Sequence, residues 1–290
     1  MLNVAELLET RVHRPDAIMT AAKARRRPAS LVDREHGKLM IIAADHPARG
    51  ALRAGGDPLA MANRVDLLDR LRTALGRPGV NGVLGTPDIL EDLLLLGALD
   101  DKVVIGSMNR GGLAGTSFEI DDRFTAYDAD SIADAGFEGG KMLLRIDPAD
   151  AGTVTTLQAC GNAVTALAAR QRMAMVEPFI SHRVDGRVRN ELTAEAMIRA
   201  CTVSAGLGNT SAYTWLKVPV VPEMERVMAA TTLPALILGG EVSDDADGAY
   251  AQWSKALDLP TVHGLVIGRS LLYPASGTVA DAVDRAVGLL

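Results

Sequence analysis

The chain is short of cysteine, of long apolar runs and of basic charge. Its 290 residues include two cysteines, Cys160 and Cys201, which lack CxxC spacing. We therefore expect two small core residues rather than a disulfide or a redox pair. No apolar run reaches about 18 residues and no signal peptide is recognisable, so neither a membrane span nor export is indicated. These absences favour a cytoplasmic protein without a membrane partner.

The charge balance is acidic, with 36 Asp and Glu against 30 Lys and Arg and a formal net charge of -6. Such a chain is poorly suited to nucleic acid, because phosphate backbones bind basic surfaces. One basic run interrupts this pattern, at residues 25–27. A solvated helix end explains that run better than a binding tail does.

No Pro/Ser-rich linker or break in composition divides the chain, and no glycine-rich phosphate loop follows the first apolar run. Short apolar runs alternate instead with segments of helical period, several of which open with a Thr or Asp cap. Eight of the apolar runs are strand candidates, at residues 38–45, 79–86, 102–108, 139–147, 172–180, 212–220, 233–240 and 263–269.

Continuous apolar runs are typical of parallel strands that are covered by helices on both faces. We predict an α/β fold, a TIM (β/α)8 barrel, as a single domain over residues 1–290, with residues 1–37 as an N-terminal helical extension. A doubly wound sheet is the structural rival, but the glycine-rich loop that such sheets carry after the first strand is missing.

A TIM barrel carries its active site at the C-terminal ends of its strands, so polar residues there become the candidates. Two lysines within apolar runs stand out among them and need an explanation. In chain order the candidates are Asp45, His46, Thr86, Ser107, Asn109, Lys141, Arg145, Glu177, Lys217, Gly239, Gly240, Gly268 and Arg269.

Lys217 lies in the middle of the apolar run SAYTWLKVPVV, residues 211–221. Side chains alternate along a strand, so Lys217 shares a face with Trp215, while Leu216 and Val218 point toward the helices. Lys217 is then either aimed at the site, or it reaches the rim and pairs structurally with Glu177. Spacing alone leaves both interpretations open.

Chemistry favours the first interpretation. A lysine becomes a useful nucleophile when burial or a second cation lowers its pKa from about 10.4 toward neutrality. Lys141 can supply that cation from the fourth strand, two strands away, since inward side chains of a barrel form layers from alternate strands. Glu177, on the strand between them, is suited to general acid and base catalysis, although a purely structural ion pair with the lysines is the alternative.

These residues resemble a known family, the class I aldolases that include tagatose-bisphosphate, sulfofructose-phosphate and bacterial-archaeal fructose-bisphosphate aldolases. The resemblance covers the chain from about Lys38 onward and is spread over at least six strand ends. Its motifs are AADH on the first strand, GGKMLLRID on the fourth, VEP on the fifth, LKVP on the sixth, and GG and GR on the last two.

The resemblance implies a TIM barrel and a Schiff base between Lys217 and a substrate ketone. It also implies that Lys141 and Asp45 belong to the catalytic site and that Glu177 acts as acid and base. Phosphate is held by the last two loops in such barrels, which points to Gly239, Gly240, Gly268 and Arg269. Further substrate contacts are expected from Arg145, His46 and Asn109.

Some stretches, among them AADHPARGALRAGGDP and EPFISHRVDGRVRN, look most like aldolases of actinobacterial inositol degradation. This resemblance suggests 2-deoxy-5-keto-gluconate 6-phosphate as substrate, cleaved to dihydroxyacetone phosphate and malonate semialdehyde. Common sugar bisphosphates and sulfofructose phosphate are the alternatives. A carboxylate on the substrate could be held by Arg49, Arg110, Arg145 or Arg183, although arginines near a barrel mouth also form rim ion pairs.

A metal-dependent aldolase is judged from the five histidines, which form no HxH or HExxH arrangement. We expect no metal and no other cofactor. His46, beside Asp45, could assist proton transfer, whereas His263 at the start of its strand is expected to be structural. A catalytically inactive sugar-phosphate sensor on the same barrel is a different functional hypothesis, which turnover of a phosphoketose would exclude. We also expect a homo-oligomer, for which the apolar helical segment DILEDLLLLGAL is a candidate interface, although a helix buried against its own barrel would show the same pattern.

Overall fold

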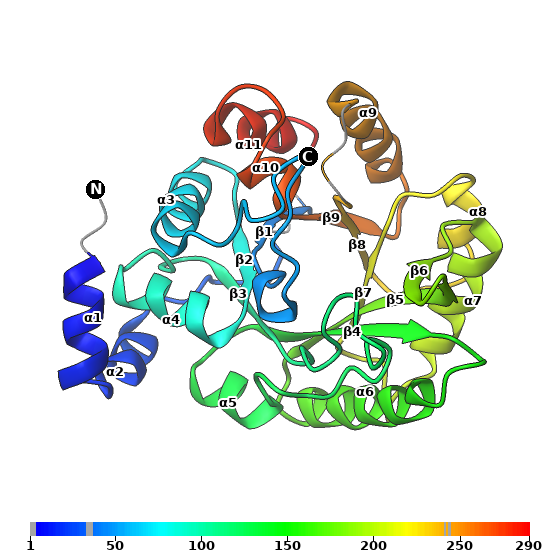
Figure 1. Ribbon diagram of the computed structural model, residues 1–290, viewed down its shortest axis with the longest axis horizontal. Coiled ribbons are helices and arrows are strands. Elements are labelled where there is room, and N and C mark those ends of the chain that lie inside the picture. Colours follow the sequence, from blue (N-terminus) through cyan, green and yellow to red (C-terminus); the bar gives the residue numbers. More distant parts are fainter. Residues whose placement is uncertain (1–3, 33–36, 241, 243–244) are drawn as a thin grey trace.

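A closed barrel of parallel strands forms the centre of the protein, and helices surround it (Figure 1). The computed structural model describes residues 4–32, 37–240, 242 and 245–290. Within these residues, eight strands pair in parallel in the order β1, β2, β3, β4, β5, β7, β8, β9, and β9 pairs back with β1. The predicted TIM barrel is therefore confirmed. The barrel strands are β1 (Leu39–Ala43), β2 (Gly82–Gly85), β3 (Val103–Ser107), β4 (Gly139–Ile146), β5 (Met173–Val184), β7 (Thr214–Val218), β8 (Ala235–Leu238) and β9 (Val262–Ile267).

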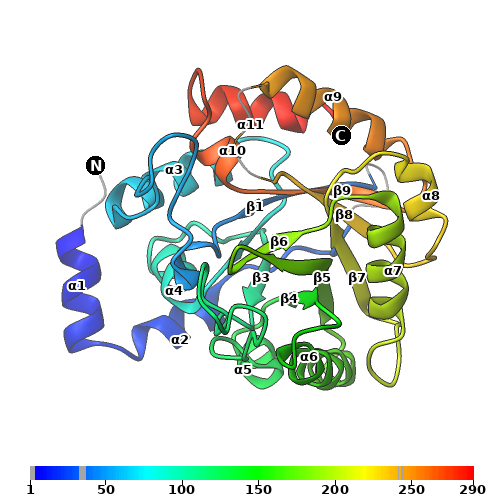
Figure 2. The same ribbon diagram turned by 45° about the vertical axis from the view of Figure 1, so that its right-hand side comes forward.

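Helices follow the strands and cover the outside of the barrel (Figures 1 and 2). Several begin at a Thr cap: Thr193, which was predicted, and Thr278 accept hydrogen bonds from the backbone N–H groups three residues later. No helix in the described ranges is long and apolar enough to cross a membrane. The helices are α1 (Val4–His13), α2 (Ala17–Ala24), α3 (Arg64–Leu75), α4 (Pro87–Leu95), α5 (Ala129–Asp134), α6 (Gly152–Ala169), α7 (Ala194–Ala205), α8 (Met224–Met228), α9 (Ala246–Leu257), α10 (Arg269–Leu272) and α11 (Val279–Val287), with a 3-10 turn η1 (Pro47–Arg49) after β1.

Alternation along the strands separates two apolar cores. On β1, Leu39 and Ile41 fill the barrel interior, while Met40 and Ile42 pack against the helices. Both sets are buried, which explains why the strands are continuous apolar runs in the sequence. Cys160 and Cys201 are buried, unbonded members of the outer core, as predicted.

The N-terminal extension packs on the side of the barrel, where α2 contacts α4 (Figure 1). Arg11 of α1 pairs with Glu91 and Asp92 of α4, the latter at 2.7 Å. The leucines of α4 are largely buried within this chain, Leu90 and Leu93 completely. They therefore do not form the exposed apolar face that was considered for oligomerisation.

The basic run at residues 25–27 is not simply a solvated helix end, so that prediction was wrong. The Arg25 side chain is 2% exposed and pairs with Glu138, the residue before β4, at 3.0 Å. It also donates to the backbone carbonyls of Lys102 and Gly136, both at 2.7 Å. Arg27, whose side chain is 47% exposed, reaches the same Glu138 carboxylate from outside. The extension is thereby tied to the base of β3 and β4 by a buried charge.

The fifth strand is longer than its apolar run predicted. β5 continues to Val184, turns at Asp185 and Gly186, which both have positive φ, and returns as β6 (Arg187–Asn190) in an antiparallel hairpin. An Asp-Gly pair between two extended segments is a hairpin signal, but it lies outside the apolar runs from which the strands were predicted. Figure 2 shows the hairpin projecting beyond the neighbouring barrel strands.

We predict that Arg25→Ala lowers the free energy of unfolding by about 3 kcal/mol, because it leaves a buried carboxylate and two carbonyls without their main donor. Arg27→Ala is the matched control and should cost less than about 1 kcal/mol, since its guanidinium is half exposed. Chemical denaturation followed by circular dichroism measures both. Equal losses in the two variants would contradict the buried role of Arg25.

Candidate active site

A cavity of about 610 Å³ opens at the C-terminal ends of the strands, where the fold predicts a site. This volume is in the range of small-molecule binding sites. Among the described residues, its wall contains seven cationic side chains but only three carboxylates, those of Asp45, Glu119 and Glu177. The cations are Arg49, Arg110, Lys141, Arg145, Arg189, Lys217 and Arg269. This excess of positive charge suits an anionic ligand.

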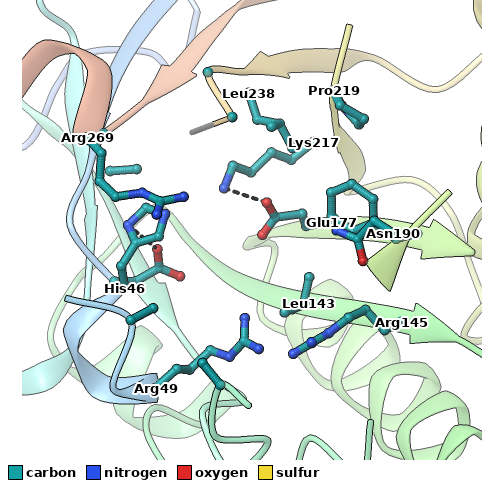
Figure 3. Close-up of a pocket in the computed structure, with 18 of the residues that line it drawn as sticks. His46, Arg49, Leu143, Arg145, Glu177, Asn190, Lys217, Pro219, Leu238 and Arg269 are labelled. Atoms are coloured by element: carbon teal, nitrogen blue, oxygen red, sulfur yellow. Dashed lines mark hydrogen bonds and ion pairs between the residues drawn. The ribbon is translucent and has the colours of Figure 1, made fainter. Parts of the chain in front are cut away.

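Four predicted catalytic residues form one connected chain of charges. The Lys217 ammonium donates to Glu177 Oε1 at 2.9 Å, and the other Glu177 oxygen pairs with Lys141. Lys141 Nζ also donates to Asp45 Oδ2 at 3.0 Å. The side chains of both lysines are at most 4% exposed, and Figure 3 shows Lys217 directed at Glu177 inside the cavity. Lys217 therefore does not reach out to solvent at the rim.

Alternate strands supply the two lysines, as predicted for inward layers of a barrel. β5 pairs with β4 on one side and with β7 on the other, so that Glu177 lies between Lys141 and Lys217. Trp215, two residues before Lys217, packs against the interior core. This packing confirms the face that alternation assigned to Lys217.

Asp45 is held at the far end of the chain by three donors. Arg110 Nη1 and Lys141 Nζ each lie 3.0 Å from its Oδ2, and the Ser107 hydroxyl donates to the same oxygen at 3.1 Å. Burial opposes ionisation of Asp45, but the charges of Lys141 and Arg110 outweigh it and hold the pKa of Asp45 well below its usual range. Asp45 therefore stays a carboxylate at neutral pH.

Burial and the nearby Arg110 lower the pKa of Lys141 to about 8. Burial acts to raise the pKa of Glu177, but the two lysines outweigh it and hold that pKa far below the usual range. Glu177 is therefore an anion in contact with both ammonium groups. It can accept a proton from Lys217 or from a bound hydroxyl group that displaces one of these contacts.

His46 lies beside Arg269 at the cavity wall, next to Asp45 of the charged network (Figure 3). Its side chain is 24% exposed. Burial in the cavity wall and the charge of Arg269 lower the pKa of His46 to about 3, against the opposing effect of Asp45. Its Nδ1 has no hydrogen-bond partner among the described residues. The imidazole is thus a neutral group that can hydrogen-bond to a ligand in the cavity.

The glycines of the last two strands allow close packing at the cavity. A Cβ on Gly268 would lie 2.3 Å from the carbonyl oxygen of Ala43, and one on Gly239 would lie 2.5 Å from a methyl carbon of Ile267. Gly240 has φ +69°, a conformation that favours glycine. These three glycines and Arg269 line the cavity, so all four predicted phosphate contacts are at its wall.

Arg49 and Arg145 approach each other in a part of the cavity away from Arg269 (Figure 3). Both guanidinium groups bond to the same Glu119 oxygen, Arg49 at 3.1 Å. Burial and the nearby Arg145 and Arg110 lower the pKa of Arg49 to about 10. Glu119 was not predicted because it lies in the long loop after β3, away from any strand end. No pattern in the sequence marks it.

Two predicted contacts lie outside the cavity wall. Asn109 is fully buried, and its amide exchanges hydrogen bonds of 2.6 and 2.7 Å with the backbone of Leu143, which ties the loop after β3 to β4. Arg183 pairs with Asp150 at 2.8 Å. Conversely, the hairpin brings Arg189 and Asn190 to the cavity wall. They were missed together with the hairpin itself.

Within the described ranges, no group of three or more His, Cys, Asp or Glu side chains is arranged to hold a metal ion. The polar groups of the cavity are instead dominated by ammonium and guanidinium donors, which bind anions.

Comparison with known proteins agrees with the fold. The Cgl0159-like family matches residues 37–287. The chain belongs to this family. A crystal structure of Cgl0159 from Corynebacterium glutamicum is 53% identical, covers 99% of this chain and 96% of its own, and superposes with a TM-score of 0.96. No functionally curated protein matches the chain.

More distant structures share the barrel. An archaeal fructose 1,6-bisphosphate aldolase is 18% identical with a TM-score of 0.63, and covers 94% of this chain and 97% of its own. The fructose-bisphosphate aldolase of Slackia heliotrinireducens is 16% identical with the same TM-score, and covers 92% of this chain and 81% of its own. At such identities the likeness shows the fold alone.

We predict that the His46 ring does not titrate between pH 5 and 8. Its lowered pKa, about 3, means that the proton is lost below this range and that the ring is neutral throughout it. Imidazole ¹⁵N–¹H spectra recorded across the range, with the signals assigned by their loss in His46→Gln, measure this. A titration of those signals with a midpoint near that of a free imidazole would contradict the prediction.

Proposed function

We propose that the protein is a class I aldolase that cleaves a phosphorylated keto sugar or keto sugar acid through a Schiff base on Lys217. The single observation that carries this proposal is the buried contact between Lys217 and Glu177, 2.9 Å long, within a cavity rich in cations. Two buried lysines are unfavourable for stability alone, whereas a nucleophilic amine beside an acid and base is what imine chemistry needs. The shared barrel of the Schiff-base-forming fructose-bisphosphate aldolase supports the proposal by its fold.

In the first half of the reaction, Glu177 takes a proton from the Lys217 ammonium, and the neutral amine attacks the ketone carbon. The nitrogen passes one of its two protons to the former carbonyl oxygen, which gives a carbinolamine with a hydroxyl group. That hydroxyl group leaves as water, and the resulting iminium carries the positive charge. Glu177 gives up its proton to the departing hydroxyl group, so it is again a carboxylate when the iminium is complete.

Cleavage follows at the bond between the α and β carbons. Glu177 accepts the proton of the β-hydroxyl group, the β carbon becomes an aldehyde, and the bonding electron pair moves to the α carbon to form the enamine. Glu177 then protonates the α carbon. Water hydrolyses the iminium, which releases the ketone product and the Lys217 amine.

Lys141 and Asp45 support these steps by their contacts with each other and with Glu177. Lys141 contacts both carboxylates, so it keeps Glu177 in place while Glu177 exchanges protons. Its charge, with that of Lys217, also holds Glu177 as a carboxylate. Asp45, held by Arg110 and Ser107, offsets part of this positive charge. Lys141 and Asp45 are thus positioning residues in this mechanism.

The substrate that we favour is 2-deoxy-5-keto-gluconate 6-phosphate, which would yield dihydroxyacetone phosphate and malonate semialdehyde. The resemblance of the sequence to inositol-degradation aldolases and the positive cavity support this choice. Arg269, with the backbone N–H groups of the neighbouring glycines, would bind the phosphate. Fructose 1,6-bisphosphate, the substrate in the names of distant structural relatives, is the alternative.

We predict that sodium borohydride added with dihydroxyacetone phosphate inactivates the protein and leaves a mass adduct on Lys217. Reduction traps the imine as a stable secondary amine, which peptide mass spectrometry locates. Lys217→Ala should lose both the adduct and all turnover, whereas EDTA should change neither in the unmodified protein. An adduct on another lysine, or turnover that chelation stops and borohydride does not, would exclude the proposed mechanism.

We also predict that Arg269→Ala raises KM for a phosphorylated substrate about 10- to 100-fold, because a charge-assisted hydrogen bond to the phosphate is lost. Steady-state kinetics for release of dihydroxyacetone phosphate measure this effect. Arg183→Ala is the control, since Arg183 pairs with Asp150 away from the cavity. An unchanged KM in Arg269→Ala would remove Arg269 from the phosphate site.

A further inference from the structure

The guanidinium group of Arg145, a residue of the cavity wall, contains two buried donors that the described residues leave unpaired. Its Nη1 pairs with Glu119, but its Nε and Nη2 have no hydrogen-bond partner among the described residues, although both are buried. These two nitrogens lie on one edge of the guanidinium plane and donate in parallel. Such an edge matches the two oxygens of a carboxylate or phosphate. Buried donors of this kind are rarely left without a partner, so they indicate a ligand.

The charges around this edge leave one positive charge to be neutralised. Arg49 and Arg145 share Glu119 as their common partner, and the buried carboxyl group of Asp122 also acts on both. Arg110 shares Asp45 with Lys141, and Lys141 shares Glu177 with Lys217. Over this connected network, five cations face four carboxyl groups: Arg49, Arg110, Arg145, Lys141 and Lys217 against Asp45, Glu119, Asp122 and Glu177. A singly charged carboxylate balances this group, whereas a phosphate monoester carries about 1.5 to 2 negative charges near pH 7.

The strand geometry places this group nearer the cavity mouth than the lysines. Lys141 and Arg145 are four residues apart on β4 and share a face, which separates their Cα atoms by about 13 Å. Figure 3 shows Arg49 and Arg145 on one side of the cavity, Arg269 and His46 on another, and Lys217 with Glu177 on a third. A ligand that forms an ion pair with Arg145 on one side and with Arg269 on the other therefore carries an anionic group at each end.

We propose that Arg145 and Arg49, with Glu119 as their counter-ion, form a subsite for a carboxylate at the end of the substrate that becomes the aldehyde. This inference rests on the proposed aldolase function for the position of the reacting ketone. The charge of Glu119 determines whether the subsite prefers a carboxylate or a second phosphate. Of the four arginines that were candidates for binding a carboxylate, Arg49 and Arg145 belong to the subsite and Arg183 does not.

The test uses the condensation direction, with dihydroxyacetone phosphate as donor and three aldehyde acceptors: malonate semialdehyde, glyceraldehyde 3-phosphate and propionaldehyde. The unmodified protein should prefer the carboxylated aldehyde by kcat/KM. Arg145→Gln should lower kcat/KM for that aldehyde about 10- to 100-fold and leave propionaldehyde nearly unchanged, because only the bidentate contact is lost. The borohydride adduct on Lys217, which needs no aldehyde, should form at the same rate in the variant.

Two further variants sharpen the assignment. Glu119→Gln adds one net positive charge to the subsite and should shift the preference toward glyceraldehyde 3-phosphate; an unchanged preference would overturn the choice of a carboxylate over a phosphate. Arg183→Gln should behave like the unmodified protein with all three acceptors. Equal losses for all three acceptors in Arg145→Gln would show a structural role and overturn the subsite.

Calorimetric measurement of malonate binding distinguishes a wrong subsite from a wrong aldolase function. Malonate should bind the unmodified protein and Lys217→Ala, and binding should weaken at least tenfold in Arg145→Gln. If malonate binding depends on Arg145 but no adduct forms on Lys217, the subsite stands and the aldolase function fails. If the adduct forms but Arg145 affects neither malonate binding nor acceptor preference, the function stands and the subsite is wrong.

Discussion

The contact of one carboxylate with two buried ammonium groups is the interaction on which the candidate site depends. Lys141 and Lys217 cannot both be charged inside a barrel unless an anion lies between them, and β5 supplies Glu177 at that position. Asp45, Arg110 and Ser107 extend the same network across the barrel to β1 and β3. The cluster is costly to bury and well suited to move protons, so its presence is better explained by chemistry than by stability.

The barrel and its lysine layer could be predicted because both depend on regular periodicity. Apolar runs marked all eight barrel strands, and the alternation of side chains placed Lys217 inward with Trp215. Glu119, Arg189 and Asn190 could not be found in this way, because they reach the cavity from a long loop and a hairpin. Loop conformation depends on distant contacts, such as the bonds of Asn109 with the backbone of Leu143. The Asp185-Gly186 turn was the one local signal that could have revealed the hairpin.

The roles of the arginines could not be predicted, for a common physical reason. Sequence alone does not show which carboxylate an arginine meets, so Arg25 was expected in solvent although it lies buried against Glu138. For Arg183 a carboxylate ligand and an ion pair were both considered, and the structure shows an ion pair with Asp150. Long side chains with several donors take their roles from partners that are remote in sequence.

The link between Arg25 and Glu138 makes the N-terminal extension a support of the barrel strands. The family match starts at residue 37, but Glu138 directly precedes β4, the strand that carries Lys141 and Arg145, and it also accepts a hydrogen bond from the backbone of Val104 on β3. A shortened chain that starts at the family boundary would lose the cation that neutralises this carboxylate at the base of both strands. The amino-terminal helices thus help to hold the strands that carry the lysine cluster, and trimming the chain to the barrel would remove a support of these strands at the end remote from the cavity.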